Sequence, residues 1–133
     1  MSAFLALQAA VIEAMRNDPG VTALIGARSY DRPPDNAVHP YVTLGPADAF
    51  EDDAEGITAL EVTQQIDVWS LYQGGQSEAR RVADAVRKAL HNHETALADG
   101  TLVDMRVTAV RVMADPDGVT SHGVVTIQAL VDE

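Results

Sequence analysis

The sequence predicts an α+β fold in which an antiparallel sheet of about four strands carries two helices on one face. Two stretches place apolar residues at three- and four-residue spacing, as amphipathic helices do, and several others alternate apolar with polar residues, as half-buried strands do. The order along the chain is helix, strand, strand, helix, strand, strand, which favours two hairpins joined into one sheet. At 133 residues the chain is expected to form one domain, 1–133.

The first predicted helix begins after Ser2, a residue type that caps helix N-termini, and ends at the run 18–20, Asp-Pro-Gly. A short apolar turn is expected over 21–25. The segment 31–45, DRPPDNAVHPYVTLG, then holds three prolines, which favour an extended backbone ahead of the first strand at about 41–47. The apolar face of this helix comprises Phe4, Leu7, Val11, Ala14 and Met15.

The second predicted strand has its apolar residues Leu60, Val62, Ile66 and Val68 on one face, and Trp69 and Leu71 interrupt the polar side. A second amphipathic helix begins at Ser77. In the third strand the apolar parity changes near Ala109, which predicts a β-bulge. Residues 115–118, Asp-Pro-Asp-Gly, fit a type I turn that leads to a last strand containing Val125 to Val131.

Charge and composition exclude several classes of function. Twenty acidic against nine basic residues give a net charge of -11, which disfavours tight binding to phosphate backbones. The chain has no cysteine, so thiol catalysis and thiolate metal sites are absent. The apolar N-terminal stretch lacks the basic region of a signal peptide, and no run approaches membrane-spanning length, so no membrane partner is expected.

The densest group of candidate ligands is an acidic run, DAFEDDAEG, at 48–56. Its spacing lacks the alternating ligands and the glycine of an EF-hand loop, so a metal site is disfavoured and no cofactor is expected. Two interpretations stay open: a solvated hairpin tip, or a loop that faces a partner or a channel. Its five carboxylates belong to Asp48, Glu51, Asp52, Asp53 and Glu55.

Catalytic patterns are weak elsewhere. The run His91-Asn92-His93 shares its letters with HNH nucleases but stands at a helix end, where the helix dipole favours histidine. No serine lies in a G-x-S-x-G elbow, and Gly74-Gly75 lacks the Walker lysine. The sequence therefore predicts no catalytic residue and no metal ligand.

A set of turn and strand motifs, taken in order, resembles the tail completion or tail terminator family of long-tailed phages, prophages and the gene transfer agents of alphaproteobacteria. The likeness spans nearly the whole chain. The motifs are Arg28, Tyr30-Asp31-Arg32-Pro33-Pro34, Pro40-Tyr41-Val42-Thr43-Leu44-Gly45, Val68-Trp69-Ser70, Glu78-Ala79, Ala83-Asp84-Ala85-Val86, Asp115-Pro116-Asp117-Gly118 and His122-Gly123-Val124.

The resemblance implies a structural virion protein that closes into a ring, usually of six copies, at the head-proximal end of the tail tube. Its implied partners are further copies of itself, the tail tube protein and the head connector or stopper protein, while DNA passes through without specific binding. It would be assembled in the bacterial cytoplasm and located in the tail of a virion or phage-like particle. The family offers no catalytic residues to transfer.

Within this framework we expect Arg28, Asp31, Arg32 and Trp69 to contribute to a subunit or tube interface. The prolines beside them would hold this segment in one shape, although a stiff connection in a monomer explains them as well. The acidic run would face the lumen or a partner.

Two other functions remain open from sequence. The uncovered face of the sheet, with Trp69 and Leu71, could form the pocket of a monomeric or dimeric ligand-binding module. Less favoured is a metal-dependent hydrolase that uses the acidic run with a divalent ion.

Overall fold

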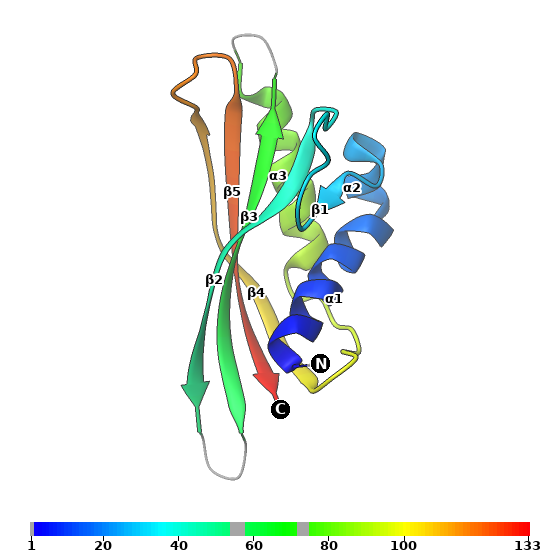
Figure 1. Cartoon of the computed structure of the whole chain (residues 1–133), viewed down its shortest axis with the longest axis vertical. Helices are drawn as coiled ribbons and strands as arrows, with labels where there is room; N and C mark the ends of the chain where they lie inside the picture. Colours follow the sequence, from blue (N-terminus) through cyan, green and yellow to red (C-terminus); the bar gives the residue numbers. More distant parts are fainter. Residues whose placement is uncertain (1, 54–57, 72–74) are drawn as a thin grey trace.

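The computed structural model describes residues 2–53, 58–71 and 75–133. These residues form one sheet of five strands with three helices on one of its faces (Figure 1). The predicted α+β class and the single helix-covered face are confirmed. The elements are α1 (Ala3–Asn17), α2 (Pro19–Ile25), β1 (Ser29–Tyr30), β2 (Tyr41–Asp52), β3 (Ala59–Ser70), α3 (Ser77–Leu90), β4 (Thr101–Ala114) and β5 (Ser121–Asp132).

Local capping explains where the first two helices begin. The Ser2 hydroxyl accepts the backbone N–H of Leu5 at 3.1 Å, and the Asp18 carboxylate accepts that of Val21 at 3.0 Å. Asp18 is extended, so it ends α1, and with Pro19 it also supplies the cap and the first residue of another helix. The turn predicted at 21–25 is therefore wrong, because this segment belongs to α2.

The strand order is β1-β2-β3-β5-β4. All neighbours are antiparallel except β1, which runs parallel to β2 and pairs only with Val42 and Thr43. A two-residue strand leaves no periodic signal, which is why the sequence predicted four strands. As a result only the first part of β2, at Val42 and Thr43, has a strand on its outer edge.

The strand predicted at about 41–47 is longer than expected, because β2 continues to Asp52. Alanine and aspartate disfavour strands, but the regular partner β3 pairs with β2 as far as Ala59. A bulge separates Leu44 from Ala47, and the Gln64 side-chain amide donates to the Gly45 carbonyl there at 3.0 Å.

The β4–β5 hairpin contains both the bulge and the turn that the sequence predicted. The register shifts between Val107 and Ala109, where the bulge was expected, and a second shift follows Leu102. In the turn, the Asp117 carboxylate accepts the backbone N–H groups of Val119 and Thr120 and the Thr120 hydroxyl. These hydrogen bonds, the hydroxyl first, hold the pKa of Asp117 below its usual range.

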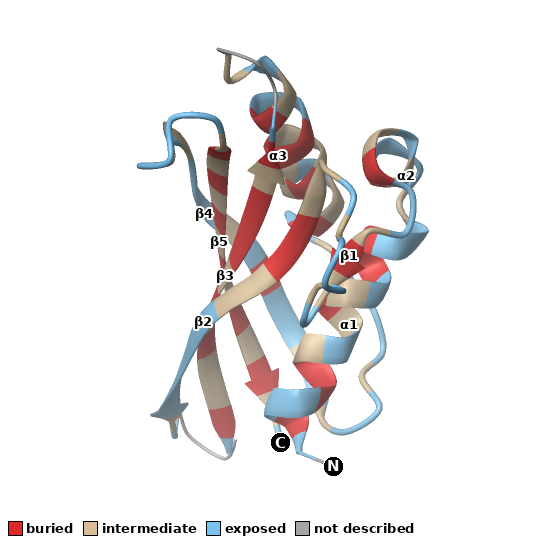
Figure 2. Ribbon diagram, turned by 45° about the horizontal axis from the view of Figure 1, so that its top comes forward, coloured by how far each residue is buried: buried red, intermediate tan, exposed pale blue. Residues whose placement is uncertain are grey.

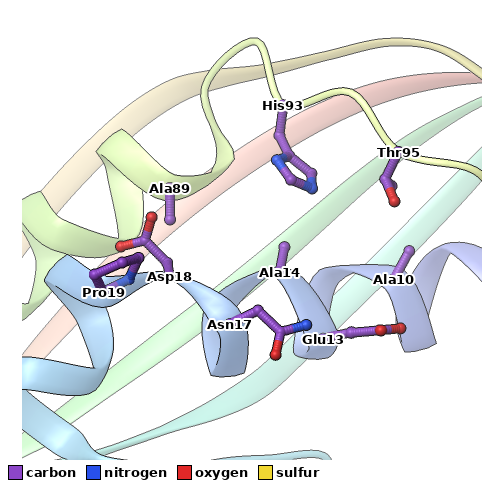
Figure 3. A pocket seen from close by; sticks show the side chains of 9 residues that line it. All are labelled: Ala10, Glu13, Ala14, Asn17, Asp18, Pro19, Ala89, His93 and Thr95. Carbon is purple, nitrogen blue, oxygen red and sulfur yellow. The ribbon is translucent and has the colours of Figure 1, made fainter.

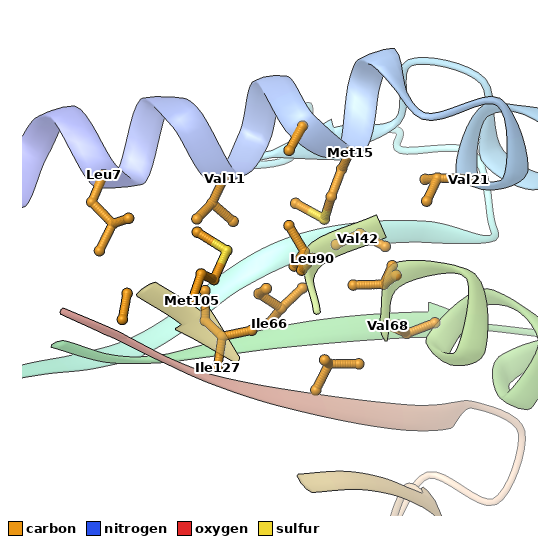
Figure 4. Packing of buried hydrophobic residues seen from close by; sticks show 14 of the residues in the cluster. Leu7, Val11, Met15, Val21, Val42, Ile66, Val68, Leu90, Met105 and Ile127 are labelled. Carbon is orange, nitrogen blue, oxygen red and sulfur yellow. The ribbon is translucent and has the colours of Figure 1, made fainter. Parts of the chain in front are cut away.

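The core lies between the helices and the sheet. Figure 4 shows Leu7, Val11 and Met15 of α1 above Ile66 and Ile127 of the sheet, and all five are at most 2% exposed. Burying each such side chain contributes about 1.5–3 kcal/mol relative to leaving it exposed. These contacts therefore fix the helices on one face of the sheet.

Exposure is uneven along the sheet. Figure 2 shows the buried residues under the helices, whereas the lower half of β2 is exposed on both faces. The end of β2 thus projects from the body as a ribbon with β3 (Figure 1). Among the described residues, no helix has the length and apolarity that crossing a bilayer requires.

Candidate functional site

The helix-free face of the sheet holds the one aromatic residue predicted to take part in an interface. The Trp69 ring stacks on His122 of the neighbouring β5, with ring centroids 4.1 Å apart and planes 9° apart. The Trp69 indole N–H donates to the Thr43 hydroxyl at 3.0 Å. The His122 Nε2 lies 2.7 Å from a carboxylate oxygen of Asp67, which also accepts from Gln65 at 2.9 Å.

Trp69 is therefore engaged on both sides by its own chain. Its stack and its hydrogen bond tie β2, β3 and β5 together, and the ring is only partly exposed. The Trp69 ring therefore offers only part of its surface to the pocket of a ligand-binding module, although Phe50, 61% exposed, is a second aromatic on this face near the end of β2. In the tail-interface hypothesis, Trp69 acts as a support for the surface around it.

Replacing Trp69 by phenylalanine is expected to lower the free energy of unfolding by about 0.5–1.5 kcal/mol, the usual contribution of one hydrogen bond. Phenylalanine keeps a ring against His122 but cannot donate to Thr43. Chemical denaturation measures the change, and Thr43→Val tests the same bond from its other end. A Trp69→Phe variant that is as stable as the parent, yet fails to associate, would favour direct contact with a partner instead.

The proline-rich segment folds back on the edge of the sheet. The Arg28 Nε donates to the Pro40 carbonyl at 2.9 Å, and the Arg28 carbonyl accepts the N–H of Val42, so this arginine holds the segment at both ends. The His39–Pro40 peptide is cis. Asp31 and Arg32 are exposed between these anchors. Of the predicted interface residues, Arg28 and Trp69 flank Pro40 and Tyr41, and Asp31 and Arg32 form the accessible tip.

The predicted acidic loop is largely a strand. Asp48, Glu51 and Asp52 belong to β2 and Asp53 follows it, while Glu55 lies outside the described residues. Asp48 pairs with Thr63 and Asp52 with Ala59, so both lie on the helix-free face, whereas Glu51 lies on the other face. Strand alternation thus separates the carboxylates, and within the described residues no three acidic or histidine side chains gather as metal ligands.

A groove between α3 and β4 was missed by sequence reasoning. It has a volume of about 400 Å³ and is lined by Arg80, Asp84, Val110 and Val112. Val110 lies on the helix side of β4 and is 40% exposed in this groove. The sequence signal for this groove was the group of charged residues Asp84, Arg87 and Lys88 on α3. In the structure the Arg87 Nε and the Lys88 Nζ lie 2.8 and 3.3 Å from the Asp84 carboxylate and lower its pKa.

A second hollow, of about 230 Å³, lies between α1 and the end of α3 (Figure 3). His93 and Thr95 form one wall, and Asn17 and Asp18 lie on the other side. The Asp18 carboxylate already caps α2. Among the described residues no hydrogen bond joins the His93 ring to the Thr95 hydroxyl, so the hollow shows no paired nucleophile and base.

The comparison with protein families decides what kind of molecule carries these surfaces. Residues 9–132 match the family model described as "Tail completion protein gp17". The chain belongs to this family. The matched range includes all the strands and most of α1, so the assignment covers the whole sheet.

Individual relatives of this tail completion protein agree. The tail completion protein gp17 of Bacillus phage SPP1 is 23% identical over 129 residues, which cover 96% of this chain and 92% of the relative. A chain in the structure titled "Virion of native gene transfer agent (GTA) particle" has a TM-score of 0.87 and 27% identity, covering 96% of this chain and 95% of that one. The solved structure of SPP1 gp17 has a TM-score of 0.57 and 20% identity, covering 93% and 87%, and supports the fold.

The resemblance inferred from the turn motifs is thus confirmed. The chain is a tail component of a phage or gene-transfer-agent particle, and its family is structural rather than enzymatic. The hydrolase hypothesis is set aside on this ground. Function is therefore to be sought in the surfaces of the chain.

Proposed function

We propose that copies of this tail completion protein form a closed ring, of six copies, at the head-proximal end of the tail tube. The ring ends tube growth and offers a surface to the head connector or stopper protein. The observation that carries this proposal is the family match over residues 9–132, together with the likeness over 96% of the chain to a chain of a gene-transfer-agent virion.

A ring built by rotation needs two different surfaces on each copy, because each contact is head to tail. This chain has two dissimilar sheet edges, the lower part of β2 and the whole of β4. The first carries only acidic charge between 46 and 52, and the second lies beside the cations of α3. Such a pair of edges suits a head-to-tail contact and disfavours a two-fold dimer.

Charge supports a lumen through which DNA passes without being held. The net charge of -11 repels phosphate, and the repulsion acts over about one Debye length, roughly 8 Å at physiological salt. On the helix-free face, Asp52, Asp104, Glu61 and Asp132 occupy the same end of the sheet. We place this acidic end toward the lumen or the tube.

The tip formed by Asp31 and Arg32 is the surface proposed for a subunit or the tube protein. Arg28 fixes its base through Pro40, and the prolines at 33 and 34 restrict the backbone beside it. A segment held in one shape loses less conformational entropy when it binds.

Electron microscopy of the purified chain with and without tail tubes tests the ring. We expect rings capping one end of each tube, with the mass of the bound species, measured in parallel, equal to six chains. A chain that stays a single particle at every concentration and also leaves tube ends bare would refute the proposal.

A further inference from the structure

We propose that neighbouring copies join by β-strand pairing: the acidic edge of β2, residues 46–52, pairs with the upper edge of β4, residues 109–114, of the next copy. This inference rests on the proposed ring and names the surfaces that build it. It places the acidic residues of 46–52 in a contact between copies, whereas the sequence predicted that they face the lumen or a partner.

The two edges are open in the described chain. β1 pairs with β2 only at Val42 and Thr43, so the outer edge of β2 has no strand beside it farther along. An unpaired edge strand is a template for another chain unless it is short, twisted or covered. β2 and β4 have 12 and 14 residues, which is longer than the average strand.

Part of the β4 edge is covered by the chain itself, which restricts where a neighbour can pair. The Asn92 N–H donates to the Met105 carbonyl at 2.9 Å, and the Val107 N–H donates to the His91 Nδ1 at 3.1 Å. Asn92 has a positive φ of 58°, so the end of α3 bends onto the strand. Above this cap, no described residue outside β5 forms a backbone hydrogen bond with the stretch from Ala109 to Ala114. The open stretch is the one beside the groove.

The side chains of the two open stretches are complementary. Arg111 lies within the upper stretch of β4, and Arg80 lines the groove beside it together with Asp84, while Asp115 directly follows the strand. Residues 46–52 carry three acids and no cation. Arg111 forms no ion pair or hydrogen bond among the described residues, and it lies on the helix-free face because it pairs with Val124. Six of the nine Lys and Arg residues belong to α3 or β4: Arg80, Arg81, Arg87, Lys88, Arg106 and Arg111.

One register satisfies both faces at once. If Asp48 lies opposite Arg111, then Ala49 lies opposite Val110 and Ala47 opposite Val112. The two alanines are on the helix side of β2, as Val110 and Val112 are on β4, so small side chains meet the exposed Val110 and the partly buried Val112 at the groove. The charges meet on the helix-free side. Cross-strand pairs of these kinds stabilise a sheet by about 0.2–1 kcal/mol each.

Topology gives the junction the right direction. β2, β3, β5 and β4 alternate in direction, so β2 and β4 are antiparallel within one copy. A copy rotated about an axis that runs roughly along the strands therefore presents β4 antiparallel to the β2 of its neighbour. The antiparallel sheet continues across the junction without a change of hand or face.

The required offset also fits a closed sheet. Within one copy, Ala49 is aligned through β3 with Ala129 of β5, whereas Val110 pairs with Val125 of β5. Pairing Ala49 with Val110 of the next copy therefore shifts the strand register by four residues for each copy that is added. At about 3.3 Å per residue this is roughly 13 Å, over four strand spacings of about 4.8 Å each. The ratio of this shift to the width of four strands corresponds to a strand tilt of about 35°, at the lower end of the 35–45° typical of closed barrels.

Disulfide trapping tests the contact, because the chain has no cysteine of its own. Directly opposed strand residues have Cα atoms about 5.5 Å apart, which suits a disulfide. With tail tubes present, oxidised Ala49→Cys/Val110→Cys should give covalent multimers up to the full ring. The matched control, Ala49→Cys/Val119→Cys, places its second thiol on the exposed β4–β5 turn and should stay single. Rings on tubes that yield no specific multimers overturn the strand pairing and leave the proposed ring standing.

Charge reversal supplies a second, independent readout. Arg111→Asp and Asp48→Arg should each weaken occupancy of tube ends by roughly tenfold or more, because like charges would then face each other across the junction. The double variant restores opposite charges and should recover binding. Arg106→Asp, the same change on the capped part of β4, should bind as the parent does. Unaltered single variants, or a double variant that stays defective, would contradict the inference, whereas a parent chain that never binds tubes would refute the ring itself.

Discussion

Replacing Ile66 by alanine is expected to lower the free energy of unfolding by about 2–5 kcal/mol, the range for removing a large buried aliphatic side chain. Ile66 is fully buried in β3, in the cluster that also holds Met15, Leu90, Met105 and Ile127 (Figure 4). Alanine would leave a cavity where α1 and α3 meet the sheet. Urea denaturation followed by circular dichroism measures the loss.

Two controls separate a cavity from a general effect of truncation. Ile66→Val removes one methylene and should cost about 0.5–1.5 kcal/mol. Val119→Ala removes exposed methyl groups, since Val119 is 63% exposed, and should change stability by less than about 0.5 kcal/mol. Equal losses at Ile66 and Val119 would contradict the position of the core.

The burial of Ile66 could be predicted from sequence because β3 lies in the middle of the sheet, with one face under the helices. A strand in that position must alternate, and a helix on such a sheet must carry an apolar stripe, so β3, β5, α1 and α3 leave periodic patterns. The bulge at Ala109 was visible for the same reason: the apolar parity of β4 changes there.

The parts that were mispredicted are held by contacts that leave no period. The end of β2 is a strand only because β3 pairs with it, so its acids were expected in a loop. α2 has seven residues, and β1 has two. The surroundings of Trp69 leave no period either, because its stacking partner His122 is 53 positions away in the sequence. That Trp69 contributes to an interface stays a prediction.

Gly100 joins the start of α1 to the open end of the β4–β5 hairpin, and Gly100→Ala is expected to destabilise the protein by about 2–5 kcal/mol. Gly100 has a φ of +78°, which disfavours any residue with a Cβ. An added Cβ would also lie 2.8 Å from the Asp132 carbonyl oxygen and 2.9 Å from the Ala3 Cβ. Neither neighbour is the end of a flexible side chain, so α1 or β5 would have to move.

Gly118→Ala isolates the steric part of this effect. Gly118 has nearly the same φ, +76°, but an added Cβ there has no neighbour within 4 Å. This variant should therefore lose only the cost of a left-handed backbone, about 1–2 kcal/mol. Thermal unfolding of the two variants side by side measures the difference, and equal losses would mean that α1 is not packed against Gly100. Thr101 directly follows this glycine and begins β4. A larger loss of stability at Gly100 than at Gly118 would therefore show that α1 packs against the start of β4, the edge strand through which we expect copies to join.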